Sequence, residues 1–293
     1  MGAMFLADAR LMAIWLLLPA YAGAQEPWVE HRIEKIVSGF HYIGGMAASR
    51  DGHLLFSDSP RGRIHKWAAG QEVTFLPEAF KDPAGLAVDE HGRLLVCESG
   101  ARRIVRIKPG DTLDPIVTAF EGRPLNSPRD MAIRKDGTVF FTDPAFGSSH
   151  ESMSLSFHGV YRLSSKGEAV ALARWDRRPT GIALSPDGKT LYVAIGDDRT
   201  IHAFDLDRQG NASGDRVLIS GISGVPNALR TDDKGRLYVA AHMVYIYSPE
   251  GKPLGQIETT DRPTSLAFGE AGGKTLFVGT RSSIYRVEFG ASR

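Results

Sequence analysis

Six copies of one short pattern run through this chain between about residue 40 and residue 290. Each copy begins with a Pro-x-small step and continues with a short apolar strand, a tight turn, a second apolar strand, a polar turn and a third strand. The second copy, residues 83–107, shows this order clearly. Successive copies begin about 37 to 51 residues apart, a period typical of β-propellers rather than of helical repeats.

The tight turn inside each copy is the strongest local signal. Asp-Gly between two β-rich runs indicates a hairpin, because such turns need residues at positive φ. The copies begin at Gly44 (with Ile43 in the place of proline), Pro83, Pro128, Pro179, Pro226 and Pro263. Their turns are Asp51-Gly52, His91-Gly92, Asp136-Gly137, Asp187-Gly188, Lys234-Gly235 and Gly272-Gly273. Short strands repeated in this way predict an all-β fold, a six-bladed β-propeller.

A missing strand predicts how the ring closes. Five copies contain a fourth strand, at residues 72–76, 115–120, 169–174, 216–220 and 253–258. The sixth copy ends with its third strand, residues 283–287, and a spare strand, residues 33–38, precedes the first copy. We therefore predict that residues 33–38 pair with residues 283–287, so that the N-terminal strand completes the last blade.

Residues 1–24 have the pattern of a signal peptide. Arg10 precedes an apolar run at residues 11–18, and Ala22-Gly23-Ala24 fits the small-x-small rule for cleavage. The run is much shorter than the roughly 20 apolar residues of a membrane span. A buried N-terminal helix is the alternative, disfavoured because the segment has no polar face. We expect one propeller domain over residues 25–293 in a periplasmic or secreted protein that is not an integral membrane protein.

Composition narrows the partners. The formal net charge is +1, which gives no reason to expect nucleic acid, since nucleic-acid binding calls for a clustered basic face. The single cysteine, Cys97, rules out an intramolecular disulfide and lies in an apolar strand, where a core position is expected. We expect a small-molecule ligand or substrate and no nucleic acid.

The binding site is expected where the innermost strands begin, around the central channel. The second strand of each copy runs antiparallel to the first, so its end returns to the same face. Two rings therefore surround one mouth. The inner ring is Gly44, Ala84, Arg129, Thr180, Asn227 and Thr264, and the outer ring is Asp58, Glu98, Asp143, Asp197, His242 and Thr280. The longest insertion on this side, residues 144–158, is interpreted as either a lid or a surface loop.

Six stretches together point to a known family. They are residues 97–103, 125–130, 141–147, 160–162, 185–194 and 266–269, and with the sequence between them they cover most of residues 40–290 in the right order. These stretches resemble the family of gluconolactonase, senescence marker protein and luciferin-regenerating enzyme. The resemblance implies a six-bladed propeller, often one that hydrolyses sugar lactones or related esters.

The same resemblance implies one divalent cation in the channel, such as calcium or zinc, held by a Glu, two Asn and an Asp. Here the corresponding positions hold Gly44 (or Ile43, if the alignment shifts by one), Arg129, Thr180 and Asn227. A hard cation prefers oxygen ligands with carboxylates among them. This ring offers no carboxylate and adds a permanent guanidinium charge. We expect no bound metal and no other cofactor.

The ring residues divide into two candidate sets. The candidate catalytic residues are His242, Asp143 and Glu98, and the candidate substrate-binding residues are Arg129, Asp130, Thr180 and Asn227. His242 is a general base near neutral pH or a turn histidine satisfied by the backbone. Arg129 is an anion anchor or the partner of a nearby carboxylate. No Gly-x-Ser-x-Gly elbow occurs in the sequence, which gives a serine-hydrolase triad little support.

Two functions remain open from the sequence. The first is a hydrolase of lactones or esters, or a metal-independent relative that acts on a small molecule. That molecule is either neutral or anionic. The second is a non-catalytic periplasmic propeller that binds a ligand or a protein. A deep pocket with His242 within hydrogen-bond reach of a carboxylate favours catalysis, and a shallow mouth walled by Arg129 and small residues favours binding.

Overall fold

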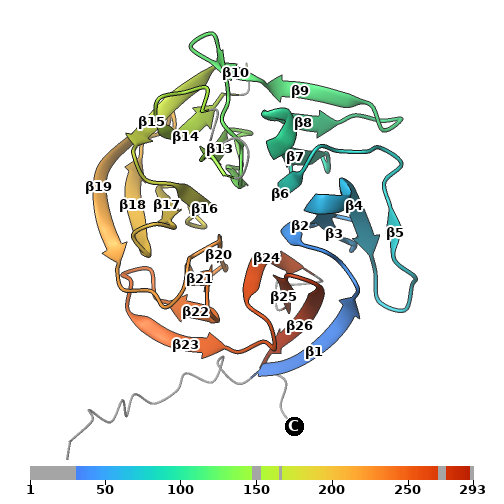
Figure 1. Cartoon of the computed structure of the whole chain (residues 1–293). Helices are drawn as coiled ribbons and strands as arrows, with labels where there is room; N and C mark the ends of the chain where they lie inside the picture. Colours follow the sequence, from blue (N-terminus) through green and yellow to red (C-terminus); the bar gives the residue numbers. More distant parts are fainter. Residues whose placement is uncertain (1–30, 147–152, 165–166, 270–274, 291–293) are drawn as a thin grey trace, which may run out of the picture.

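Six four-stranded antiparallel sheets stand around one axis in the computed structural model (Figure 1). It describes residues 31–146, 153–164, 167–269 and 275–290. The prediction of an all-β, six-bladed β-propeller is confirmed. The signal peptide predicted at residues 1–24 lies outside the described residues. Within them, no helix is long and apolar enough to cross a membrane.

Each blade is a sheet whose strands follow in chain order from the channel outward, except in the last blade. Blade 1 contains β2 (Ile43–Ala48), β3 (Leu54–Asp58), β4 (Arg63–Trp67) and β5 (Thr74–Phe75), and blade 2 contains β6 (Pro83–Val88), β7 (Leu94–Glu98), β8 (Arg103–Ile107) and β9 (Leu113–Val117). Blade 3 contains β12 (Met131–Ile133), β13 (Val139–Asp143), β14 (His158–Leu163) and β15 (Ala169–Trp175), and blade 4 contains β16 (Pro179–Leu184), β17 (Thr190–Ile195), β18 (Thr200–Leu206) and β19 (Ala212–Ile219). Blade 5 contains β20 (Ala228–Thr231), β21 (Leu237–Ala240), β22 (Val244–Tyr247) and β23 (Pro253–Ile257).

The first strand of the described chain closes the ring, as predicted. Blade 6 has the order β1 (His31–Ser38), β26 (Ser283–Phe289), β25 (Thr275–Thr280) and β24 (Pro263–Gly269), with β1 outermost. In the β1–β26 pairing, Ile33 lies opposite Val287 and Ser38 lies opposite Ser283. Figure 1 shows β1 curving along the outside of β26.

Three predicted outer strands have clearly different bounds in the structure: residues 72–76 correspond to β5 (Thr74–Phe75) and residues 216–220 to β19 (Ala212–Ile219). The third is the outer strand of blade 2. The sequence pattern places it at residues 115–120, whereas β9 spans Leu113–Val117 and a separate hairpin follows, β10 (Ala119–Phe120) with β11 (Arg123–Pro124). Proline has no N–H to donate and is tolerated on an edge strand, which explains why β9 runs through Pro115 at the rim of blade 2.

Close packing of the innermost strands explains the Pro-x-small step. A Cβ atom added at Gly45 would lie 2.3 Å from the carbonyl oxygen of Ala84 in the next blade. One added at Gly85 would lie 2.7 Å from the Cα of Asp130, and one at Gly181 would lie 2.8 Å from the Cα of Ala228. In blades 1, 2 and 4 the third residue of the step is therefore kept small by the neighbouring backbone, so this feature of the repeat stabilises the packing of the blades.

The core lies between blades rather than in one centre. In the described part of the chain, six apolar clusters each join residues of two neighbouring blades. Between blades 2 and 3, Tyr161 stacks on Phe141 with ring centroids 4.9 Å apart. Cys97 is fully buried in the same cluster, so its predicted place in the core is confirmed. This packing fixes the blades around the channel and thereby positions the residues at its mouth.

Candidate functional site

The acids of the outer ring turn back toward their own blades. Glu98 is 1% exposed, accepts a hydrogen bond from the backbone N–H of Lys81 at 2.8 Å and pairs with Nε of Arg103 at 2.6 Å. Asp143 is fully buried and accepts the N–H groups of Asn126 and Ser127, one on each oxygen, both at 2.8 Å.

Two further acids follow the same pattern. Asp58 accepts the backbone N–H groups of His41 and Tyr42, each at 3.2 Å, and Asp197 accepts the N–H of Arg178 at 2.9 Å. In all four cases the acid at the end of a blade's second strand holds the segment that leads into the first strand of the same blade. The catalytic role predicted for Glu98 and Asp143 stays a prediction, and the contacts around both carboxylates are those of a loop anchor.

Burial dominates the electrostatics of Asp143. The loss of water raises its pKa to about 7, and the hydrogen bonds from Asn126 and Ser127 and the charge of Arg102 oppose that rise. The Asp143 carboxyl therefore changes its charge near neutral pH inside a dry part of blade 3.

His242 lies on the surface, just after β21. Its backbone N–H donates to the carbonyl of Ser223 at 3.1 Å. Its side chain is exposed, and among the described residues its ring has no hydrogen-bond or ion-pair partner. The sequence analysis links catalysis to a His242 ring within hydrogen-bond reach of a carboxylate. Among the described residues this contact is not formed. The role of His242 as a general base stays a prediction.

Arg129 stands beside two aromatic rings at the start of the innermost strand of blade 3. Its Nη2 donates to the hydroxyl of Tyr42 at 3.2 Å, and its Cζ lies 5.9 Å from the Tyr42 ring centroid and 5.8 Å from that of Phe146. Among the described residues no carboxylate pairs with it. Burial lowers its pKa, but Tyr42, Asp130 and Asp82 together outweigh burial and raise it above the ordinary value, so the guanidinium stays charged.

Asp130 uses a different partner, although it follows Arg129 in sequence. Its carboxylate pairs with Nη1 of Arg230 at 3.2 Å and accepts the N–H of Ile182 at 3.2 Å. Successive residues of an extended segment point in opposite directions, which separates the surroundings of Arg129 from those of Asp130. The pair joins blade 3 to blade 5 with blade 4 between them, so Asp130 is engaged inside the channel.

The other two predicted substrate-binding residues differ in access. The hydroxyl of Thr180 is buried and donates to the carbonyl of Pro226 in the next blade. Asn227 is partly exposed, and its side-chain amide donates to the carbonyl of Val225 at 3.1 Å. Ligand contacts at Arg129, Asp130, Thr180 and Asn227 stay predictions. Of the four, Arg129 and Asn227 lie on the inner ring with part of their side chains exposed.

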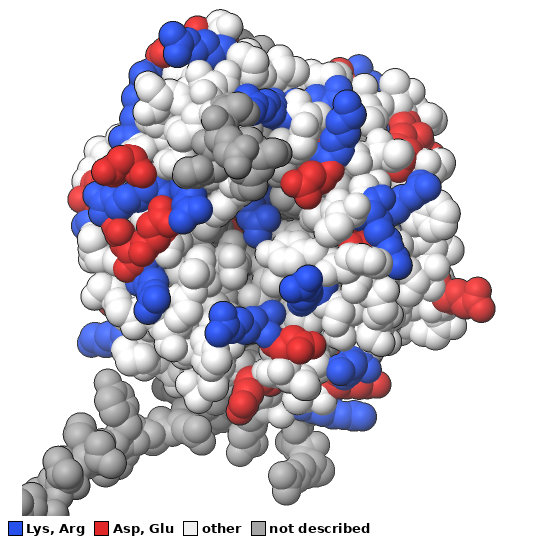
Figure 2. Space-filling model, in the orientation of Figure 1, with Lys and Arg blue, Asp and Glu red and all other residues white. Residues whose placement is uncertain are grey.

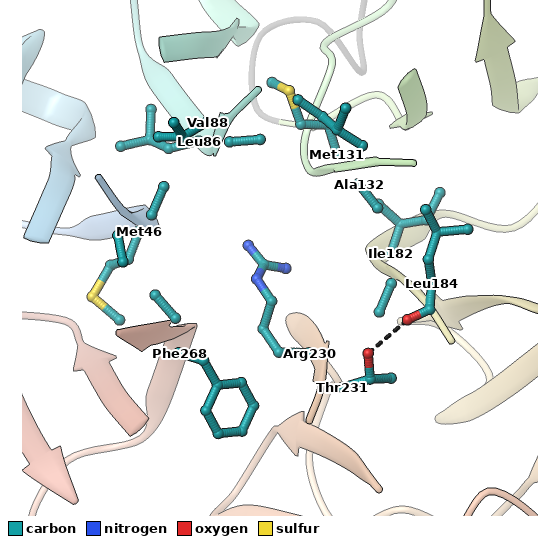
Figure 3. A pocket seen from close by; sticks show the side chains of 16 residues that line it. Met46, Leu86, Val88, Met131, Ala132, Ile182, Leu184, Arg230, Thr231 and Phe268 are labelled. Carbon is teal, nitrogen blue, oxygen red and sulfur yellow. Dashed lines mark hydrogen bonds between the residues drawn. The ribbon is translucent and has the colours of Figure 1, made fainter. Parts of the chain in front are cut away.

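Arg230 is a channel residue that the sequence analysis does not single out. One signal marks it, since the fifth residue of each Pro-x-small segment is alanine in five copies. These residues are Ala47, Ala87, Ala132, Ala183 and Ala267, and Arg230 takes the same position in blade 5. All six line a cavity of about 330 Å³ formed by the later halves of the innermost strands. Figure 3 shows Arg230 extending into the middle of this cavity.

The two ends of the channel are distinct. The blades run anticlockwise in chain order in Figure 1 and clockwise in Figure 3, so the two views show opposite faces of the ring. On the face of Figure 1, Figure 2 shows a central hollow with Lys or Arg atoms inside it. Basic side chains therefore reach the channel from this side, and the Arg230 cavity belongs to the other.

The insertion at residues 144–158 is anchored at both flanks. The backbone N–H of Ala145 donates to Nδ1 of His158 at 3.1 Å, and that of Leu155 donates to Oδ1 of Asn126 at 3.2 Å. Leu155 is 3% exposed and packs in the cluster between blades 2 and 3. Residues 147–152 lie outside the described residues, so the lid interpretation stays a prediction. Phe146, at the start of the insertion, contacts Arg129 directly.

The inner ring does not fit the divalent cation that the family resemblance implies. Ile43 is fully buried and apolar, and a Cβ at Gly44 would lie 2.3 Å from Oγ of Ser59, so neither position has room or chemistry for a carboxylate ligand. Arg129 brings a positive charge, and the Thr180 hydroxyl already donates a hydrogen bond to the carbonyl of Pro226. Within the described residues no three His, Cys, Asp or Glu side chains gather in a way that could hold a metal.

Comparison with known proteins agrees with this fold. The family described as "SMP-30/Gluconolactonase/LRE-like region" matches residues 44–282. A gluconolactonase from Zymomonas mobilis is 32% identical over 287 residues, which covers 87% of this chain and 80% of that protein. Lactonase drp35 from Staphylococcus epidermidis is 28% identical over 248 residues, covering 79% of this chain and 72% of that protein.

Solved structures agree as well. The structure of a gluconolactonase from Xanthomonas campestris has a TM-score of 0.81 at 29% identity, with 88% of this chain and 89% of that chain covered. A regucalcin from Agrobacterium tumefaciens, described as a calcium-binding protein, shares the fold, with a TM-score of 0.73 at 18% identity over 86% of this chain and 92% of that chain. The chain is thus a lactonase-like propeller and belongs to the SMP-30/gluconolactonase/LRE-like family.

Proposed function

We propose that this protein hydrolyses a small lactone or ester and that Arg129 acts where relatives of this family are expected to use a cation. The observation that carries the proposal is the guanidinium of Arg129, which lies at the start of the innermost strand of blade 3 without a carboxylate partner among the described residues. The likeness to a gluconolactonase from Zymomonas mobilis supports the reaction class.

The chemistry needs a positive charge at this point. Water adds to the carbonyl carbon, the acyl C–O bond breaks, and the products are a hydroxyl group and a carboxylate. Negative charge builds up on the carbonyl oxygen, and a preorganised donor placed against that oxygen lowers the barrier. A guanidinium supplies N–H donors and a permanent charge, and it also binds the carboxylate product through up to two hydrogen bonds. The proton of the attacking water needs an acceptor, and His242 remains the residue proposed for it.

A second function is favoured by different observations. The carboxylates of Glu98 and Asp143 are buried and hold backbone amides, and the ring of His242 has no partner among the described residues. A propeller with these features binds a carboxylate at Arg129 and releases it unchanged. The experiment below separates the two functions.

The test compares Arg129 with a matched arginine. Arg178 lies 5.1 Å from the Phe146 ring, but its guanidinium is paired with the carboxylate of Asp197. Arg129→Gln is expected to lower kcat/KM for glucono-lactone or another lactone or ester substrate by about 100-fold, the usual cost of one oxyanion donor. It should also weaken binding of gluconate in calorimetry, whereas Arg178→Gln stays close to wild type. Gluconate binding without turnover of any substrate in a lactone and ester screen supports the binding function, and neither binding nor turnover contradicts both.

We further propose that the protein is exported to the periplasm or secreted. The signal-peptide pattern of residues 1–24 supports this. N-terminal sequencing of protein from separated cell fractions should find a mature chain near Gln25, and a full-length chain in the cytoplasm contradicts it.

A further inference from the structure

Tyr42 has a fixed place at the channel mouth. It directly precedes β2, its backbone N–H donates to the carboxylate of Asp58 at 3.2 Å, and its carbonyl accepts the N–H of Ser59 at 3.0 Å. Both backbone groups of Tyr42 are therefore tied to the end of the second strand of blade 1. The side chain leaves this anchored point, is partly buried, and reaches Arg129 on blade 3.

The hydroxyl of Tyr42 has one partner and one unused hydrogen. Its oxygen accepts a hydrogen bond from Nη2 of Arg129 at 3.2 Å. Because that oxygen is the acceptor, its own hydrogen must point away from the guanidinium. Among the described residues the Tyr42 hydroxyl has no acceptor for this hydrogen. A phenol held in this way has one O–H left to donate to a ligand.

We propose that the Tyr42 hydroxyl and the Arg129 guanidinium form a two-donor site for one negatively charged oxygen, either of a bound carboxylate or of the carbonyl oxygen during hydrolysis. The proposal deepens the proposed function and rests on it for the second half of this statement. The donors come from blades 1 and 3 and are already in contact, so a ligand oxygen that approaches Arg129 also approaches the Tyr42 hydroxyl. In the reaction this oxygen becomes negative as water adds to the carbonyl carbon, and both donors are in place before that happens.

The neighbouring groups do not provide the same pair. Arg178 also lies near the Phe146 ring, but its Nε and Nη2 both donate to the carboxylate of Asp197. Thr180 donates its hydroxyl to Pro226. Among these residues at the mouth, Tyr42 is the one whose hydroxyl has a spare hydrogen beside an unneutralised cation.

The test removes the hydroxyl and keeps the ring. Tyr42→Phe preserves the aromatic contact with Arg129 but deletes the second donor. We expect gluconate binding, measured by calorimetry, to weaken by about 10-fold, the usual effect of one hydrogen bond to a charged group. We expect kcat for glucono-lactone to fall by about 100-fold and KM to change much less. In the double variant Tyr42→Phe/Arg129→Gln, the loss of gluconate-binding free energy should be smaller than the sum of the losses in the two single variants, because both donors act on one oxygen.

A matched tyrosine controls for the loss of a hydroxyl as such. Tyr285 in β26 is 5% exposed, and its buried hydroxyl has no hydrogen-bond partner among the described residues, so Tyr285→Phe should match wild type in binding and turnover. Melting temperatures of all variants report any loss of folding.

The outcomes separate the two ideas. Weaker gluconate binding in Tyr42→Phe, with no turnover of any substrate in the lactone and ester screen even by wild type, keeps the two-donor site and rejects the hydrolase function. Turnover and binding that are both unchanged in Tyr42→Phe reject the two-donor site and leave the hydrolase function standing. An effect on KM alone, equal in Tyr42→Phe and Tyr42→Leu, rejects donation to the reacting oxygen and assigns Tyr42 to the positioning of Arg129.

Discussion

Asp143 is a residue whose position in the repeat suggests chemistry and whose contacts serve the fold. It ends the second strand of blade 3 on the mouth side, where a catalytic acid is expected. Each of its oxygens instead accepts a backbone N–H, from Asn126 and from Ser127. Burying a carboxylate is costly unless its hydrogen bonds are satisfied, so this residue anchors the segment that enters β12.

Asp143→Asn is expected to destabilise the fold. The amide places an NH₂ group against the N–H of Asn126 or Ser127, and leaving a buried donor unsatisfied costs about 1–3 kcal/mol of the free energy of unfolding. Urea unfolding measures this cost. If Asp143→Asn has wild-type stability and impaired turnover, the carboxylate acts in catalysis rather than as an anchor.

The same variant carries a pH signature. Burial raises the pKa of Asp143 to about 7 in the folded protein, against about 3.9 in an unfolded chain. Between these values the folded state holds the extra proton, so the stabilising contribution of this group is complete below about pH 4 and is lost as pH rises through about 7. The stability difference between wild type and Asp143→Asn should narrow between pH 5 and pH 8, and a difference that widens contradicts this assignment.

At the scale of elements, β1 carries the closure of the ring. It covers the outer edge of β26, and Glu34 pairs with Arg286 at 2.9 Å across the two strands. Ile36 and Val37 pack against the cluster between blades 6 and 1. Without β1, the backbone groups of β26 form an exposed sheet edge, which invites pairing with other chains.

Deleting residues 31–38 should therefore give an insoluble or much less stable protein. The matched control is a variant that begins at His31 and keeps the whole of β1. Thermal melting and the soluble fraction after expression compare the two. Equal melting temperatures contradict the closure role of β1.

The elements were easier to predict than the directions of their side chains. Turn residues such as Gly52, at φ 83°, and the small residues of the innermost strands act locally, so they appear in the sequence as a repeat. The pairing of Asp130 with Arg230 joins residues 100 positions apart across the channel, and no local periodicity encodes it. The end of the second strand likewise predicts on which face of the ring an acid lies. The direction of its carboxylate depends on nearby backbone N–H groups, such as that of Lys81 beside Glu98.

At the scale of the whole molecule, the charge of the channel sets its ligand preference. The positions aligned with the family's metal ligands contain no carboxylate, Arg129 adds a positive charge, and the charge of Asp130 is matched by Arg230. A divalent cation close to Arg129 meets a repulsion of several kcal/mol, since two unit charges 4 Å apart interact by about 4 kcal/mol at an effective dielectric constant of 20.

Chelation should consequently leave the protein unchanged. We expect EDTA to alter neither the melting temperature nor any turnover, and added calcium or zinc to have no saturable effect on melting. Elemental analysis of the purified protein is the companion measurement. Stoichiometric calcium or zinc, together with a lower melting temperature after chelation, contradicts this expectation.

The pairing of β1 with β26 also imposes an order in time. β1 is the first described strand to be synthesised and β26 is the last, and the Glu34–Arg286 pair joins positions 252 residues apart. Blades 1 to 5 each consist of consecutive strands and can form as those strands emerge, but blade 6 needs both ends of the fold at once. Until β26 arrives, β1 has no partner and the sheet edge that it covers does not exist. A nascent chain thus passes through an open ring, and that interval is when chaperones, proteases and neighbouring chains have most access to it.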